Sequence, residues 1–300
     1  MLQQLIYRTI YNRNINYLLR WINKGLSPIL PASLQLPPSG VIHVKSGEDG
    51  FLLDTNQTSY LTQRLFWDGP DAFEYTTLFR QLIRKVDTFL DVGANIGYYT
   101  FLACSENKDI RVWSFEPAEG AHRYLVRNLQ LNRSGDQVTV EKLALSDHTG
   151  SITFHEVTNP KYPWLQEVLS GESNASTKSL NRDYATIRVE ADTLDAWYRR
   201  KRMSGLDLIK IDTEGAEVAV LEGGRETLAE QRPIIICEIL FNLNESEIER
   251  FMKELGYNFY LFRDGQLHPS DTLIREVDDG VRDCFFVHPD RYPLVAEFVA

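Results

Sequence analysis

Carboxylates gather behind two short apolar segments in the second half of the chain. Residues 206–211 read LDLIKI and are followed by Asp212 and Glu214, while residues 233–239 carry Glu238 near their end. Two neighbouring carboxylates raise each other's proton affinity, so one of them can take a proton from a hydroxyl group. We therefore predict that Asp212, Glu238 and Glu214 are catalytic.

Other roles for these carboxylates stay open at this point. The same oxygens suit a divalent cation, although no residue is assigned here as a metal ligand. Glu238 has a structural alternative, which is pairing with Lys210 or with a backbone amide. Glu217, a little further on, can instead satisfy the amides at the start of its own helix.

A glycine-containing turn precedes these segments. Residues 91–97 read DVGANIG and follow an apolar segment at residues 88–92. Glycine lets a backbone turn tightly against a ligand, and amides at a helix start face that ligand. The spacing is Gly-x-x-x-Gly, and the dinucleotide pattern G-x-G-x-x-G is absent. The predicted cofactor contacts here are Asp91, Gly93, Ala94, Asn95 and Gly97, the alternative being a plain turn between a strand and a helix.

Two further stretches suit a nucleoside cofactor. Glu116 and Pro117 end the next apolar segment, and an ionised carboxylate at that place accepts both hydroxyls of a ribose. A surface carboxylate is the alternative for Glu116. Ala144 and Leu145 lie in the string LALSD and offer an apolar slot for an adenine ring, with Asp147 or a backbone amide at its edge.

Alternating strands and helices must position these residues from residue 87 onwards. Parallel strands with crossover helices read as near-continuous apolar runs. We predict an α/β fold with a mostly parallel seven-stranded sheet, closed by a terminal antiparallel hairpin of residues 257–262 and 283–288. Residues 151–157 extend that sheet or cover its edge. The helices are predicted at residues 71–85, 96–105, 119–132, 193–199, 216–230 and 245–255.

The ordered strings DVGANIGYYT, FEP, LALSD, IKIDTEGAE and CEI resemble the FkbM methyltransferase family over about residues 74–240. The resemblance implies a class I methyltransferase, Rossmann-like fold and S-adenosylmethionine as the cofactor. It also implies a hydroxyl oxygen of a sugar, glycolipid or secondary metabolite as acceptor. By position it places Asp91, Gly93, Asn95 and Gly97 in the cofactor loop, Glu116 at the ribose and Asp212 in the site. Phe73-Glu74 matches a further family feature. The alternatives are a nicotinamide-dependent oxidoreductase and a non-catalytic, partner-binding domain.

The chain divides by pattern into an N-terminal extension and a catalytic domain. Residues 1–70 read as an amphipathic helix over 2–23, a loop rich in proline, and a small hairpin of 41–45 and 51–54. Residues 71–300 are the predicted methyltransferase domain. Residues 158–186 are polar and form a predicted lid or insertion. Because neither the extension nor this insertion has a family counterpart, we expect acceptor choice to reside there.

Charge is unevenly spread along the chain. The net charge is −10, yet residues 1–47 hold five basic residues and no acidic one, so that the remainder carries −15. Such an acidic body speaks against a nucleic-acid partner. The basic amphipathic segment has three alternatives, namely packing on its own domain, a homodimer contact, or an anionic membrane surface. With no apolar run of membrane length, no signal pattern and three scattered cysteines, we expect a reducing, cytoplasmic setting.

Overall fold

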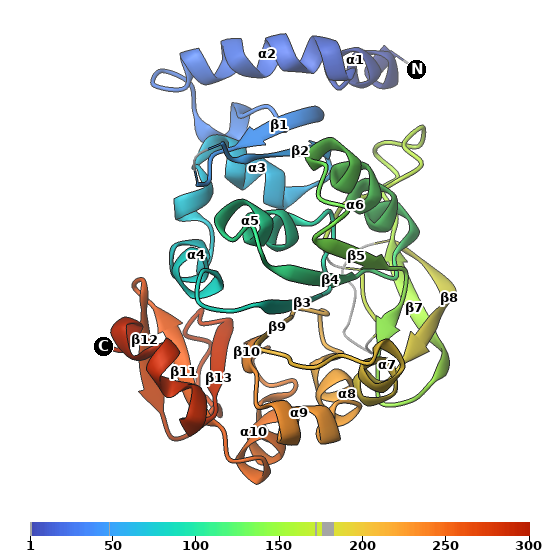
Figure 1. Cartoon of the computed structure of the whole chain (residues 1–300). Coiled ribbons are helices and arrows are strands. Elements are labelled where there is room, and N and C mark those ends of the chain that lie inside the picture. The colour runs from blue at the N-terminus through green and yellow to red at the C-terminus, as the bar shows by residue number, and fades with distance from the viewer. Residues whose placement is uncertain (1, 48, 172, 176–182) are drawn as a thin grey trace.

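A computed structural model describes residues 2–47, 49–171, 173–175 and 183–300. Its centre is an eight-stranded sheet in the order β12-β11-β13-β10-β9-β3-β4-β5 (Figure 1). Five of these strands pair in parallel, and their inward apolar runs are almost completely buried, as expected for a sheet covered on both faces. They are β3 (Thr88–Val92), β4 (Arg111–Phe115), β5 (Val138–Glu141), β9 (Leu208–Ile211) and β10 (Ile234–Glu238).

The end of the sheet has one strand more than the seven predicted. Strand β13 (Asp283–Val287) lies antiparallel between β10 and β11 (Asn258–Arg263), and an additional strand, β12 (Gln266–Ser270), forms the edge. Asp264 and Gly265 join β11 to β12 with φ values of 49° and 80°. A two-residue Asp-Gly turn with both φ values positive is a strong hairpin signal, and the prediction overlooked it.

Helices cover both faces of the sheet (Figure 1). One core includes Phe89 and side chains of α4 (Thr76–Ile83), α5 (Tyr98–Glu106) and α6 (Glu119–Asn132). The other includes Leu90 and side chains of α7 (Leu194–Lys201), α8 (Glu217–Glu222), α9 (Arg225–Gln231) and α10 (Glu245–Glu254). The helix predicted over 216–230 is broken after α8, where a Cβ on Gly223 would lie 2.0 Å from the Ser146 carbonyl oxygen. The helix predicted over 71–85 is reduced to α4, preceded by the 3-10 turn η2 (Pro70–Ala72).

A second, three-stranded sheet has the order β6-β8-β7. Its strands are β6 (Ala144–Leu145), β7 (Gly150–Val157) and β8 (Tyr184–Asp192), so residues 138–145 are divided between the two sheets. Thr193 caps α7, because its hydroxyl accepts from the Ala196 amide at 3.1 Å. Residues 172 and 176–182 of the predicted lid lie outside the described residues.

The N-terminal segment contains two helices where one was predicted over residues 2–23. Helices α1 (Leu2–Ile10) and α2 (Arg13–Leu26) are separated at Asn12, whose side chain caps α2 by accepting from the Asn14 amide at 3.1 Å. The hairpin of β1 (Gly40–Val44) and β2 (Phe51–Thr55) packs on α6, where Asn128 Oδ1 accepts from the Asp54 amide at 2.6 Å.

Short elements complete the chain. Helix α3 (Tyr60–Trp67), which was not predicted, follows the hairpin. The 3-10 turns are η1 (Ala32–Leu34), η3 (Pro289–Leu294) and η4 (Ala296–Phe298). Across the described ranges, no helix combines the length and the apolar character needed to cross a membrane.

Candidate active site

A cavity of about 460 Å³ opens where β3, β4 and β9 end, and we call it the first cavity. The loop after β3 forms part of its wall. The amides of Gly93 and Ala94 both donate to the Phe115 carbonyl oxygen, at 3.1 and 3.0 Å. Gly93 has φ 77°, and a Cβ there would lie 1.9 Å from the Asp212 carbonyl oxygen. Glycine is therefore required at this position, because the loop passes directly against the end of β9.

Glu116 holds this loop in place. Its Oε2 accepts from the Asn95 amide and its Oε1 from the Ala118 amide, each at 2.8 Å. Burial raises the pKa of Glu116 to about 7, although those amides and Lys210 favour the ionised form. Each carboxylate oxygen keeps one further lone pair, so the group can still accept from a diol.

Orphaned polar atoms in the first cavity fit a polar ligand. Asn95 Oδ1 and Ser170 Oγ are both buried, and neither has a hydrogen-bond partner within the described part of the chain. A bound ligand with donors and acceptors would satisfy them. The opposite wall is apolar, and this combination suits a nucleoside joined to an amino acid. The apolar wall consists of Leu143, Ala144, Leu145, Ile152 and Phe154.

Most residues predicted to bind a cofactor border this cavity. They are Asp91, Gly93, Ala94, Asn95, Glu116, Pro117, Ala144, Leu145 and Asp212. Gly97 does not border the cavity. It is the N-cap residue of α5, with φ 93°, and a Cβ there would lie 2.5 Å from the Phe101 ring. Its role is helix packing. Asp147 is also outside, since it is exposed and pairs with His148 at 2.6 Å.

A buried cation lies between two of the predicted carboxylates. Lys210 is opposite Asp91 in the register of β9 and β3, and its Nζ lies 3.7 Å from Asp91 Oδ1 and 3.1 Å from Asp212 Oδ2. Burial opposes its charge, but Asp212 and Asp91 raise the pKa of Lys210 above the ordinary value. Burial likewise raises the pKa of Asp91, to which Thr100 donates at 2.6 Å. Lys210 therefore stays charged, and the carboxylates with which it pairs are those of Asp91 and Asp212.

The three predicted catalytic carboxylates do come together. Asp212, Glu214 and Glu238 each place an oxygen within 4.8 Å of the others. The parallel register explains this arrangement, since Ile211 pairs with Cys237 and the next residue on each strand is a carboxylate. Such a set offers ligands to a divalent cation, but an acidic cluster alone does not define a metal site.

Glu217 braces the loop that carries this cluster. Its Oε1 accepts from the amides of Thr213 and Gly215, at 3.1 and 2.9 Å, and its Oε2 accepts from Asn244 at 2.7 Å. The side chain is completely buried. Glu217 thus fixes the position of Glu214 and is not available to a substrate.

Glu74 is a site residue that reasoning from chemistry missed. It has φ 41° and accepts a hydrogen bond of 2.7 Å from the Tyr99 hydroxyl. Glu74 borders the first cavity and a neighbouring one. Its side chain is therefore open to these cavities, while protein atoms surround the rest of it. Burial, followed by the charge of Asp212, raises the pKa of Glu74 to about 7. The only feature of the sequence that pointed to Glu74 was the Phe73-Glu74 pair, which matches the family pattern.

The second cavity, of about 630 Å³, meets the first at Glu74 and Asp212. Most of its wall is charged. Glu238 faces Asp283 across the antiparallel pair of β10 and β13, and burial, with Glu74 and Asp212 nearby, raises the pKa of Asp283. The other lining residues are Phe262, Arg263, Asp264, Asp279, Gly280, Val281 and Arg282.

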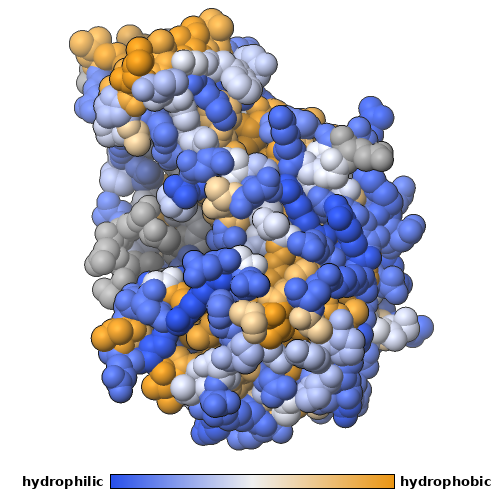
Figure 2. All heavy atoms as spheres, turned by 90° about the vertical axis from the view of Figure 1, so that its left-hand side faces the viewer, coloured by the Kyte–Doolittle hydropathy of each residue, from blue (hydrophilic) through white to orange (hydrophobic). Residues whose placement is uncertain are grey.

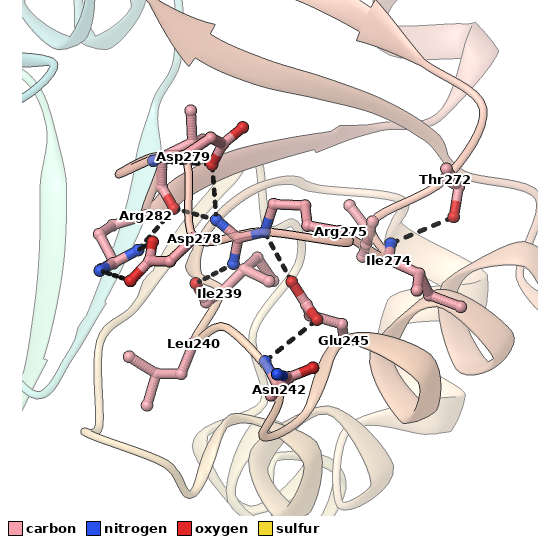
Figure 3. Close-up of polar contacts among 12 residues, drawn as sticks. Ile239, Leu240, Asn242, Glu245, Thr272, Ile274, Arg275, Asp278, Asp279 and Arg282 are labelled. Carbon is pink, nitrogen blue, oxygen red and sulfur yellow. Dashed lines mark hydrogen bonds and ion pairs between the residues drawn. The ribbon is translucent and has the colours of Figure 1, made fainter.

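Arg275 braces one wall of the second cavity (Figure 3). Its guanidinium donates to Glu245 at 2.6 Å, to Asp279 at 3.1 Å and to the Ile239 carbonyl at 3.2 Å. The segment after β10 and the loop before β13 are thereby joined through one side chain that is 10% exposed. These contacts hold the wall in one arrangement.

The strand order, with β13 antiparallel between β10 and β11, is that of a Rossmann-like α/β fold of the class I methyltransferase type. A family model described as the methyltransferase FkbM domain matches residues 91–259. The chain belongs to the FkbM methyltransferase family. This assignment favours methyl transfer over the nicotinamide alternative.

Several relatives share part of the chain. It is 30% identical over 158 residues to the 2-O-methyltransferase NoeI of Sinorhizobium fredii, covering 50% of this chain and 63% of that protein. It is 28% identical over 149 residues to Methyltransferase 1 of Beauveria bassiana, covering 46% and 58% respectively. The chain therefore spans about three fifths of the length of these curated relatives. A solved structure of methyltransferase FkbM from Methylobacillus flagellatus is 16% identical, with a TM-score of 0.44, covering 67% of this chain and 43% of that one.

Proposed function

We propose that this methyltransferase uses S-adenosylmethionine and methylates a hydroxyl oxygen of a sugar, glycolipid or secondary metabolite. One observation carries the proposal: the carboxylates of Glu74 and Asp212 border both cavities. A group able to receive a hydroxyl proton thus lies where cofactor and acceptor would meet. The name of the relative NoeI, a 2-O-methyltransferase, supports an oxygen acceptor.

The residues of the first cavity suit the parts of this cofactor. Glu116 would hold the ribose diol, the loop from Gly93 to Asn95 the amino-acid part, and Ala144 with Leu145 the adenine. When bound, S-adenosylmethionine supplies a methyl group attached to a positively charged sulfur. As the acceptor oxygen bonds the methyl carbon, the bond between that carbon and the sulfur breaks, and the sulfur leaves as a neutral thioether. The protein's part is to align the acceptor and remove its proton.

The carboxylate cluster of Asp212, Glu214 and Glu238 would align the acceptor and remove its proton. In this proposal Asp212 or Glu238 takes the hydroxyl proton, and Glu214 helps to position the acceptor. Lys210, at 3.1 Å, compensates the charge of Asp212. Glu74 joins the cluster as a proton acceptor, because a carboxylate with a pKa of about 7 matches a working pH near neutrality.

The lining of the second cavity supports a polyhydroxylated acceptor. Arg263 and Arg282 offer donors, and Asp264 and Asp279 offer acceptors, on a wall that Arg275 already orders. Hydroxyl groups of a sugar both donate and accept, so they can pair with both kinds of side chain. Phe262 adds an apolar surface to the same cavity.

Isothermal titration with S-adenosylhomocysteine, with NAD titrated in parallel, tests the cofactor. We expect binding of S-adenosylhomocysteine in the micromolar range and no heat with NAD. A screen with tritiated S-adenosylmethionine and hydroxylated acceptors, among them free sugars and glycolipids, then tests the reaction. Binding of NAD alone would overturn the proposal, and binding without transfer to any hydroxyl would favour a non-catalytic domain.

A further inference from the structure

Helix α2 turns its polar side towards the protein body. Its buried residues are Asn16, which is 0% exposed, and Arg20, which is 2% exposed. Asn16 Oδ1 accepts from the Ser39 amide at 2.7 Å, and its Nδ2 donates to the Pro37 carbonyl at 3.1 Å. Arg20 donates to the Val41 carbonyl at 2.6 Å. Since these partners are all on one side, the contacts fix the rotation of α2 about its axis.

The opposite side of α2 presents large apolar side chains to solvent. Leu18 and Ile22 are 61% and 51% exposed, and Trp21 is 50% exposed while one side of its ring packs edge-on against Phe66. The spacing of these positions places them on one face of the helix, away from Asn16 and Arg20. An amphipathic helix in a globular protein normally buries its apolar stripe. Helix α2 does the opposite, because it buries polar residues and exposes apolar ones.

Helix α1 continues the same surface. It contacts the body through aromatic rings, with Tyr7 and Tyr11 packed edge-on against Tyr162. Leu5 and Ile6 remain exposed. Figure 2 shows apolar side chains gathered at the top of the molecule, where Figure 1 places α1 and α2 in line. We call this surface the outer face, and its main members are Leu5, Ile6, Leu18, Trp21, Ile22 and Leu26.

Charge decides what covers the outer face. Residues 1–47 carry +5 while the remainder carries −15. Arg8 and Lys45 are exposed in that basic part, whereas Arg13 pairs with Asp54 at 3.1 Å and Arg20 is buried against the body. A second copy on this face would bring two positive segments together, whereas an anionic lipid surface attracts them. Tryptophan and tyrosine favour the lipid headgroup region, which suits Trp21 and the exposed Tyr17.

We propose that the outer face docks on an anionic membrane surface, with α1 and α2 lying in the plane of the headgroups. The apolar side chains enter the boundary of the acyl chains, while the polar contacts of Asn16 and Arg20 keep the helix attached to the body. This inference is independent of the cofactor and of the reaction. It stands on the orientation of two helices and on the charge of the segment.

Vesicle flotation of the full chain tests the proposal. The probes are vesicles of phosphatidylcholine with roughly one third phosphatidylglycerol, and vesicles of phosphatidylcholine alone. We expect the wild-type chain to float with the anionic vesicles and to bind the neutral ones at least about tenfold more weakly. The variant Leu18→Glu, Trp21→Glu, Ile22→Glu should lose at least about tenfold of its partitioning into anionic vesicles.

A matched control makes the same chemical change elsewhere. Leu243, Ile274 and Val277 are also exposed apolar residues, outside both cavities. Their joint substitution by glutamate adds the same charge and should leave flotation unchanged. Circular dichroism and the unfolding midpoint of each variant establish that it is folded.

Two results would overturn the proposal. One is equal flotation of the wild-type chain and the outer-face variant. The other is no flotation of the wild-type chain together with a dimer in sedimentation analysis that the outer-face variant converts to a monomer, since a second copy would then cover the face. Failure of S-adenosylhomocysteine binding would refute the proposed function and leave the flotation result unaffected.

Discussion

The Tyr99 hydroxyl donates a hydrogen bond of 2.7 Å to Glu74 Oε2 at the junction of the two cavities. The contact joins α5, which starts directly after the cofactor loop, to the turn before α4. Burial raises the pKa of Tyr99 well above its usual range, so the hydroxyl stays a donor at any physiological pH. The structure thereby fixes a carboxylate of raised pKa at the junction of the two cavities, which Asp212 also lines.

The raised pKa of Glu74 predicts a dependence of stability on pH. Its folded-state pKa is about 7, whereas an exposed glutamate titrates near ~4.3. The folded chain therefore binds more protons between these values, and its stability is full below the lower pKa and falls as the pH rises through the higher one. We expect Glu74→Gln to lose less free energy of unfolding than the wild-type chain between about pH 5 and pH 8.

Urea denaturation of both proteins at the two pH values measures this difference. Glu222→Gln serves as the control, because Glu222 is exposed on α8 and lies outside both cavities. If the free energies of Glu74→Gln and wild type changed in parallel with pH, the assignment of a raised pKa to Glu74 would be wrong.

Substitution of Glu116 should weaken cofactor binding. Glu116→Gln keeps the size of the side chain but removes the charge and one acceptor, and hydrogen bonds to charged groups contribute about 1.5–3 kcal/mol. We expect S-adenosylhomocysteine to bind roughly ten- to a hundredfold more weakly by isothermal titration. Glu119→Gln is the matched control on the same segment, since Glu119 pairs with Arg123 outside the cavity. An unchanged dissociation constant would remove Glu116 from the ribose site.

Substitution of the catalytic cluster should affect turnover more than cofactor affinity. A positioned base contributes about a hundredfold or more to proton removal. We therefore expect Asp212→Ala with Glu238→Ala to lower kcat by at least about a hundredfold while the affinity for S-adenosylhomocysteine changes much less. Methyl transfer to the acceptor found by screening provides the assay. Intact turnover in this double variant would show that neither residue is the base, and Glu74→Gln would then be the next variant to measure.

Gly93→Ala should destabilise the loop and remove cofactor binding together. The new Cβ would lie 1.9 Å from the Asp212 carbonyl oxygen, at a φ of 77°. Strain at such a backbone position costs about 1–3 kcal/mol, and the clash adds to it. Gly135→Ala is the control, because a Cβ there meets nothing within 4 Å. Thermal unfolding and isothermal titration measure both effects, and wild-type values in Gly93→Ala would contradict the described path of the loop.

Local patterns were sufficient for the central part of the fold. The five parallel strands follow from short apolar runs, and the tight turn after β3 follows from the spacing of Gly93 behind Asp91. Both are properties of a few consecutive residues. The pairing of Asp212 with Glu238 was also predictable, because parallel strands end at one edge of the sheet. The eighth strand was not predicted, although the Asp264-Gly265 turn is a sequence signal for a hairpin at that place.

Only the tertiary structure decided the surroundings of these residues. Lys210 reads as part of an apolar run, but the register of β9 against β3 places it between Asp91 and Asp212. Glu74 enters the site because a left-handed turn before α4 brings it against α5. The periodicity of α2 indicated an amphipathic helix without indicating which side meets the body. Hydrogen-bond partners on residues 37–41 decided that, since buried polar groups need partners and those of Asn16 and Arg20 lie on Pro37, Ser39 and Val41.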